Sequence, residues 1–114
     1  MRKIAIAILT AVFVLFPSLI SAAGISVVDG HKITDKKELH VKLAKDLNFP
    51  NYYGHNLDAL YDVLVAEKES TVIKIINPYS LQRKLGKKYV EGFFAAISDA
   101  SDENPRVVLI LSSK

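Results

Sequence analysis

Residues 51–62 read NYYGHNLDALYD and combine a turn, a helix start, aromatic side chains and carboxylates within twelve positions. Asp58 and Asp62 are four residues apart, so both carboxylates would lie on one face of a helix. Leucines at positions 57, 60 and 64 follow helical spacing and predict the buried face. Tyr61 falls between the leucines and the aspartates, so the helix would present an aromatic ring beside two negative charges. Such a surface suits a cationic cleft, for example one that holds phosphates.

The pattern on both sides of this segment predicts helices that alternate with strands. Asn56 is a good N-cap for the helix of the opening segment, which should end near Val65. The other expected elements are a strand at 24–28, a helix at 36–47, a strand at 71–76, helices at 80–85 and 87–100, and a strand at 107–111. Strands separated by helices pair in parallel through crossovers. The order β-α-α-β-α-α-β therefore predicts an α/β domain with a small three-stranded parallel sheet and about four helices. The last strand is almost continuously apolar, which is typical of a strand covered on both faces.

The first 23 residues have the composition of a secretory signal peptide. Arg2 and Lys3 precede an apolar run at 4–16, and small residues at 21–23 offer a cleavage point near Ala23. An uncleaved membrane anchor is the alternative, although the run is shorter than the roughly 20 apolar residues that a span needs. The chain has no cysteine, which excludes a lipid anchor on an N-terminal Cys. We therefore expect a single mature domain, residues 24–114, in the periplasm or outside the cell.

The charge of the mature chain is close to neutral. Without Arg2 and Lys3, 13 basic residues face 12 acidic ones. Bulk binding to nucleic acid or to a membrane usually requires a dominant basic field. The total charge therefore predicts no direct nucleic-acid contact and no membrane contact after signal cleavage, and any electrostatic function must come from local patches.

The three histidines raise the question of an enzyme. His31 lies in a turn and is expected to be solvated, whereas His40 lies beside the leucine stripe of its helix and is expected to be a partly buried structural residue. His55 could act with Asp58 as a general acid or base, but no second catalytic motif accompanies it. Residues 55, 58 and 62 do not share one helix face, because residue 55 precedes the N-cap, so no metal site or cofactor is predicted. One of Tyr52 and Tyr53 should anchor the loop to the core.

The chain resembles the barstar family of ribonuclease inhibitors over essentially all of its mature part. The residues that carry the resemblance are Val28-Asp29-Gly30, Leu39-His40, Leu47, Pro50, Tyr52-Tyr53-Gly54, Asn56-Leu57-Asp58-Ala59-Leu60, Asp62 and Ile110-Leu111-Ser112. The resemblance implies the same order of elements and no enzymatic activity. It also implies a one-to-one complex in which the loop and second helix plug the active site of a small secreted guanyl-preferring ribonuclease.

The resemblance assigns a role to each residue of the partner surface. Asp62 would occupy the place of the RNA phosphate, and Asp58 would add a second charge-assisted contact. Tyr52 would pack against the catalytic centre of the enzyme, while Gly54 and Asn56 would shape the loop.

The sequence departs from the family pattern in four respects. Tyr61 replaces the tryptophan that usually precedes the second aspartate. An acidic residue of the last helix has no clear match, since Ala96 falls near its place and Asp99 is the nearest substitute. The near-neutral charge and the signal peptide are also unusual. These departures keep a second hypothesis open, a periplasmic binding module of the same fold whose partner is not a ribonuclease.

Overall fold

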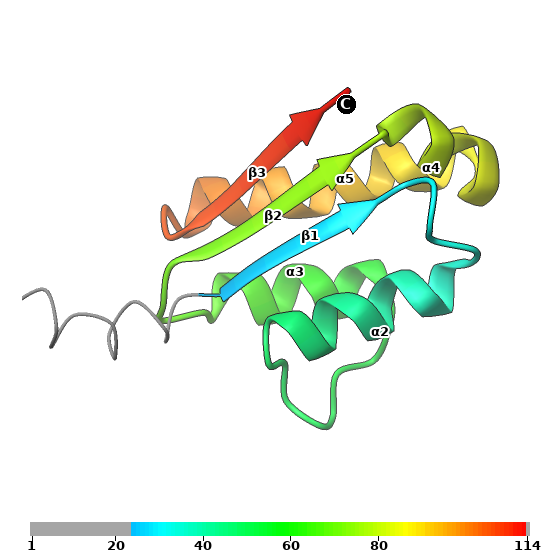
Figure 1. Ribbon diagram of the computed structural model, residues 1–114. Helices are drawn as coiled ribbons and strands as arrows, with labels where there is room; N and C mark the ends of the chain where they lie inside the picture. Colours follow the sequence, from blue (N-terminus) through cyan, green and yellow to red (C-terminus); the bar gives the residue numbers. More distant parts are fainter. Residues whose placement is uncertain (1–23, 114) are drawn as a thin grey trace, which may run out of the picture.

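The computed structural model describes residues 24–113 and has the expected order of elements (Figure 1). The signal-peptide prediction falls on residues 1–23, outside this part. The elements are β1 (Gly24–Asp29), α2 (Lys36–Asp46), α3 (Leu57–Val65), β2 (Thr71–Ile76), α4 (Pro78–Leu85), α5 (Lys87–Glu103) and β3 (Val107–Ser112). The α/β prediction with a three-stranded parallel sheet and four helices is confirmed for the described residues. In this same part, none of the helices has the length and apolar character needed to cross a membrane.

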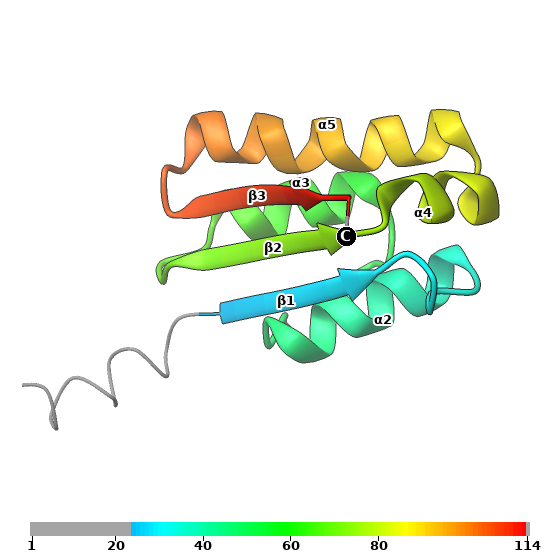
Figure 2. The same cartoon turned by 45° about the horizontal axis from the view of Figure 1, so that its top comes forward.

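The sheet has the order β1-β2-β3 with every pair parallel, so Val28 lies opposite Ile75 and Ile75 lies opposite Leu111. Both crossovers step to the next strand in the same direction. Because such connections are right-handed, they place their helices on the same side of the sheet. Figure 2 shows this arrangement, with α2, α3 and α5 on one face and α4 beyond the carboxyl ends of the strands.

One prediction about the last strand is wrong. β3 is not covered on both faces, since Val108 is exposed and Ile110 is 42% exposed. On β1, Ile25 is 61% exposed on the same open face. The right-handed crossovers place their helices on one side and leave the second face of the sheet without a helix, so the apolar run does not indicate burial on both faces.

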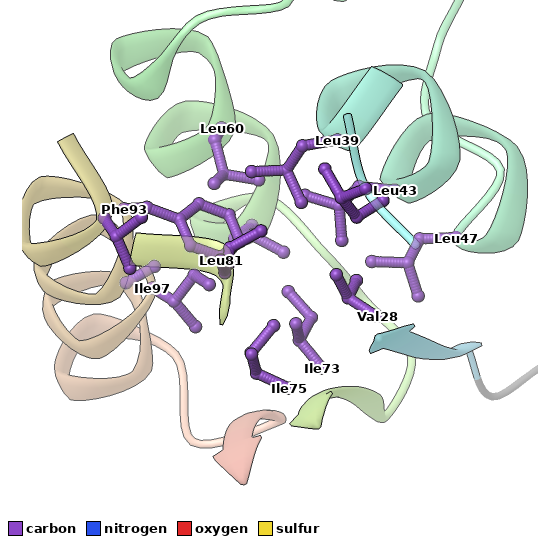
Figure 3. Packing of buried hydrophobic residues seen from close by; sticks show 14 of the residues in the cluster. Val28, Leu39, Leu43, Leu47, Leu60, Ile73, Ile75, Leu81, Phe93 and Ile97 are labelled. Carbon is purple, nitrogen blue, oxygen red and sulfur yellow. The ribbon is translucent and has the colours of Figure 1, made fainter. Parts of the chain in front are cut away.

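The core fills the space between the sheet and the three helices that cover it (Figure 3). The helical spacing predicted its members correctly: Leu39 and Leu43 of α2 and Leu60 of α3 are fully buried. They meet Ile73 and Ile75 of β2, and Phe93 and Ile97 of α5 complete the cluster. Each such side chain contributes roughly 1.5–3 kcal/mol by leaving water. This core holds the described domain without disulfide bonds, since the chain has no cysteine.

The turn after β1 requires glycine. A Cβ on Gly30 would lie 2.1 Å from the carbonyl oxygen of Asn77 and 2.8 Å from the amide nitrogen of Leu81. Close approach of two backbone segments is a position that only glycine fills. The Asp29-Gly30 turn therefore brings the end of β1 against the start of α4.

Asn104 ties the end of α5 to the end of α3. Its Nδ2 donates to the carbonyl oxygens of Glu67 at 2.8 Å and Leu64 at 3.0 Å, and its side chain is buried. These carbonyl groups lie in the last turn of α3 and just after it, where no further helical N–H group can donate to them. Asn104→Ala should therefore lower the free energy of unfolding by about 2 kcal/mol. Urea unfolding measures the loss, with exposed Asp102→Ala on the same helix as the control. An equal shift in the two variants would contradict this role.

Candidate partner-binding site

The loop at residues 48–56 is fixed to the core by two aromatic side chains. Phe49 and Tyr53 are buried with ring centroids 4.8 Å apart, and the Tyr53 amide donates to the Pro50 carbonyl oxygen at 3.0 Å. Tyr52 is 87% exposed, whereas Tyr53 is 6% exposed. The prediction that one of these tyrosines anchors the loop is confirmed, and Tyr52 points outward as a free aromatic surface.

A buried histidine clamps the same loop to two helices. His40 on α2 is 1% exposed, its Nδ1 lies 2.6 Å from the Tyr53 hydroxyl, and its Nε2 lies 2.7 Å from the Tyr89 hydroxyl on α5. The prediction of a structural histidine is confirmed. A neutral imidazole donates through one nitrogen and accepts through the other, which matches two hydroxyl partners. Burial lowers the pKa of His40 to about 4, with a smaller effect from His55. Burial also raises the pKa of the Tyr53 and Tyr89 hydroxyls, so the clamp is neutral at ordinary pH.

Asn56 joins the loop to the start of α3. Its Oδ1 accepts from the Ala59 amide at 2.8 Å, as expected for an N-cap, and its Nδ2 donates to the Gly54 carbonyl oxygen at 3.2 Å. A Cβ on Gly54 would lie 3.0 Å from that Nδ2. A larger residue at 54 would therefore press on the cap that orients α3.

The exposed side of α3 carries the two predicted carboxylates. Asp58 and Asp62 are exposed, and Tyr61 is half-buried between them and the core. Within residues 24–113, the ion pair found is Lys42 with Asp46 at 3.1 Å, so neither α3 carboxylate is neutralised by a basic side chain of this domain. Leu60 and Leu64 are buried as predicted, while Leu57 is half-buried.

A cavity of about 520 Å³ opens between the loop and α3 and brings Tyr52, Gly54 and Asp62 together. Asn56, Asp58 and Tyr61 lie outside its lining. The remaining lining residues are Asn48, Pro50, Tyr53, Ala59, Val63, Ala66, Glu67 and Lys68. Glu67 and Lys68 were not among the site residues predicted from the sequence. Both residues follow the end of α3 at Val65, so helical spacing from Asp62 does not place them in the site.

The geometry around His55 gives no catalytic pair. Its ring lies edge-on to Tyr53 at 5.2 Å and to His40 at 6.5 Å, and among the described residues it makes no hydrogen bond with Asp58. No group of three or more His, Asp or Glu side chains suited to a metal ion occurs in that part of the chain either. His55 thus contributes an aromatic surface and a polar ring to the loop.

A family model described as "Barstar (barnase inhibitor)" matches residues 24–112, which contain the entire described core and the cavity. The chain belongs to the barstar family. A Bacillus subtilis (strain 168) protein named "Putative ribonuclease inhibitor YrdF" is 29% identical over 77 residues, covering 68% of this chain and 85% of that protein. The barstar family is one of inhibitors and not of catalysts, which supports a ribonuclease-inhibitor-like role. The residues matched by the barstar family model include the loop at 48–56, α3 and His40 with its two tyrosine partners.

Proposed function

We propose that this protein is an exported inhibitor that plugs the active site of a small secreted guanyl-preferring ribonuclease in a one-to-one complex. The observation that carries the proposal is the cavity wall, where Asp62 and the exposed Tyr52 line one hollow. In the proposed complex, a carboxylate at this position would meet the basic side chains of the ribonuclease that bind RNA phosphates. Barstar-family membership supports the choice of a ribonuclease as the partner.

The chemistry of such a plug is simple. Asp62 and Asp58 would form charge-assisted hydrogen bonds with arginine and lysine side chains of the enzyme. A carboxylate offers the charge of a phosphate and no bond that the enzyme can cleave. Tyr52 would supply the aromatic anchor, a residue type that often dominates protein interfaces.

The loop is ordered before any partner arrives. Tyr53 is held by His40, and the Asn56 side chain spans Gly54 and Ala59. Rigid surfaces bind more tightly because less conformational entropy is lost on association. The clamp thus favours a plug that enters the cleft without rearranging.

Export is the part of the proposal that rests on sequence. The family match begins at Gly24, directly after the apolar segment and the small residues at 21–23. That boundary supports a leader of 23 residues followed by one domain. The inhibitor would then act in the periplasm or outside the cell.

A second candidate function is a binding module whose partner is not a ribonuclease. Lys68 lines the same cavity as Asp62 and would repel an entering cation, and Tyr61 stands where the resemblance leads us to expect tryptophan. Both features favour a less cationic partner. Affinity capture from a periplasmic extract, repeated with Asp62→Ala, would reveal such a protein by its dependence on the same carboxylate.

Titration against a panel of secreted guanyl-preferring ribonucleases tests the proposed function. With a sensitive enzyme, RNA cleavage should fall linearly and reach zero at one inhibitor per enzyme. A ribonuclease of unrelated fold is the control and should keep its activity. Full cleavage by every enzyme of the panel at tenfold excess of this protein would overturn the proposal.

A further inference from the structure

The near-neutral total charge hides a strong separation of charge within the domain. Residues 24–113 contain twelve basic and twelve acidic side chains. Half of the basic ones lie at one end, which we call the basic end: Lys36, Lys37, Arg83, Lys84, Lys87 and Lys88. This end is formed by the starts of α2 and α5 and by the end of α4, at the right of Figure 2. It lies opposite the end of the sheet at which β1 begins at Gly24.

Contacts between the elements show that these cations form one surface. The Lys36 ammonium lies 4.4 Å from the ring centroid of Tyr89 on α5, and Lys84 donates to the carbonyl oxygen of His31 in the turn before α2. Lys36, Lys37 and Lys84 also line one shallow hollow of about 360 Å³. Three carboxylates lie among the six cations, namely Asp35 and Glu38 at the start of α2 and Glu91 one helical turn after Lys87, so this end keeps an excess of positive charge.

The position of the lysines at the start of α5 is unfavourable for that helix. Helix N-termini carry partial positive charge and are stabilised by acidic side chains, not by cations. Yet Lys87 and Lys88 open α5, which has neither an acidic residue in its first turn nor a side-chain cap. Lys36 and Lys37 open α2, but there the Asp35 cap and Glu38 in the first turn supply the negative charge that α5 lacks. Residues that lower stability in this way are commonly retained for function. A function for this end explains why Lys87 and Lys88 occupy a helix start without an acidic residue to offset them.

We propose that the basic end docks on the surface of an anionic phospholipid bilayer. Five of its six cations are lysines. A lysine ammonium attracts a phosphate as a point charge and does not require one fixed orientation of the phosphate. Tyr79 on α4 is 72% exposed, and aromatic rings of this kind favour the boundary between lipid and water. Polybasic surfaces bind anionic bilayers through the summed attraction of their lysines. A single exposed ring beside the cations is a poorer match to single-stranded RNA, which binds through series of stacked bases.

The proposal revises the expectation of no membrane contact that followed from total charge. It leaves the candidate partner site accessible, because the hollow at the basic end and the cavity beside Asp62 share no lining residue. Docking would thus hold the inhibitor at a membrane through a hollow that is separate from the cavity beside Asp62. The two functions are separable by mutation.

Vesicle sedimentation of the purified protein tests the proposal, with phosphatidylcholine vesicles against vesicles containing 30% phosphatidylglycerol. The wild type should bind the anionic vesicles and be released by 0.5 M salt. Lys87→Gln with Lys88→Gln should weaken binding by about 25-fold, since each lysine at an anionic surface contributes about fivefold. Lys45→Gln with Arg106→Gln removes the same charge from exposed positions elsewhere and should bind like the wild type.

Two further readouts separate docking from loss of fold. The Lys87/Lys88 variant should keep or raise the thermal midpoint, because the change relieves an unfavourable helix-dipole interaction. It should also inhibit a sensitive ribonuclease as the wild type does. Equal binding to neutral and anionic vesicles would overturn the proposal, as would equal weakening in both double variants. Binding to a single-stranded RNA oligonucleotide without binding to anionic vesicles would overturn it in favour of a nucleic-acid surface.

Discussion

Asp62→Ala is expected to weaken the complex with a target ribonuclease by about 30- to 5,000-fold, most of it through faster dissociation. The corresponding cost of about 2–5 kcal/mol is general for truncated interfacial charge pairs and was established in part on ribonuclease inhibitors of this family. The cost is large because the enzyme's cations would stay buried without a counter-charge. Asp62 is exposed on α3 and lines the cavity beside Tyr52, so truncation removes the charge without disturbing the core.

Surface plasmon resonance with an inactive ribonuclease would separate the two rate constants. Asp102→Ala is the matched control, since it removes one exposed carboxylate from α5, away from the cavity lining. We expect the control to keep the wild-type dissociation rate. If Asp62→Ala and Asp102→Ala changed binding equally, long-range charge and not a plugging carboxylate would explain the affinity.

The sequence was sufficient to predict the fold because its local signals agree with one another. Asn56 is predicted as a helix cap and is one in the structure, and the leucines at helical spacing form the core. The boundaries shifted by a few residues, with α5 reaching Glu103 and α4 starting at Pro78. Such ends depend on tertiary contacts, as the hydrogen bonds of Asn104 to α3 illustrate.

The features that sequence reasoning missed all depend on distant contacts. His40 and Tyr89 are separated by 49 positions, so no local pattern could show that they share a hydrogen bond. The open face of β3 follows from the hand of the crossovers and not from its apolar composition. Lys36 and Lys84 became neighbours only when α2 and α4 met at one end of the sheet. Composition gives the total charge, whereas the fold decides where that charge gathers.

Acid is expected to destabilise the domain through His40 by about 3 kcal/mol once the pH has fallen to 4. Burial lowers its pKa to about 4, below the ordinary value of 6.5, so the unfolded chain takes up a proton first. The stability that the neutral ring contributes is therefore complete above pH 6.5 and is lost as the pH falls towards 4. A charged ring would donate from both nitrogens, and it would face His55 as well as the hydroxyls of Tyr53 and Tyr89.

Urea unfolding at a series of pH values between 7.5 and 4 measures this loss, with His40→Gln as the comparison. Glutamine can donate and accept but does not titrate, so the variant should be less stable at pH 7.5 and lose less stability on acidification. Asp29 and Glu38, whose hydrogen bonds hold their pKa values below the ordinary range, contribute equally to both proteins. Parallel curves of unfolding free energy against pH for the two proteins would show that a group other than His40 causes the loss of stability in acid. A steeper curve for the wild type would mean that protonation of His40 releases the clamp on the Tyr53 loop, because that ring joins the loop to both α2 and α5.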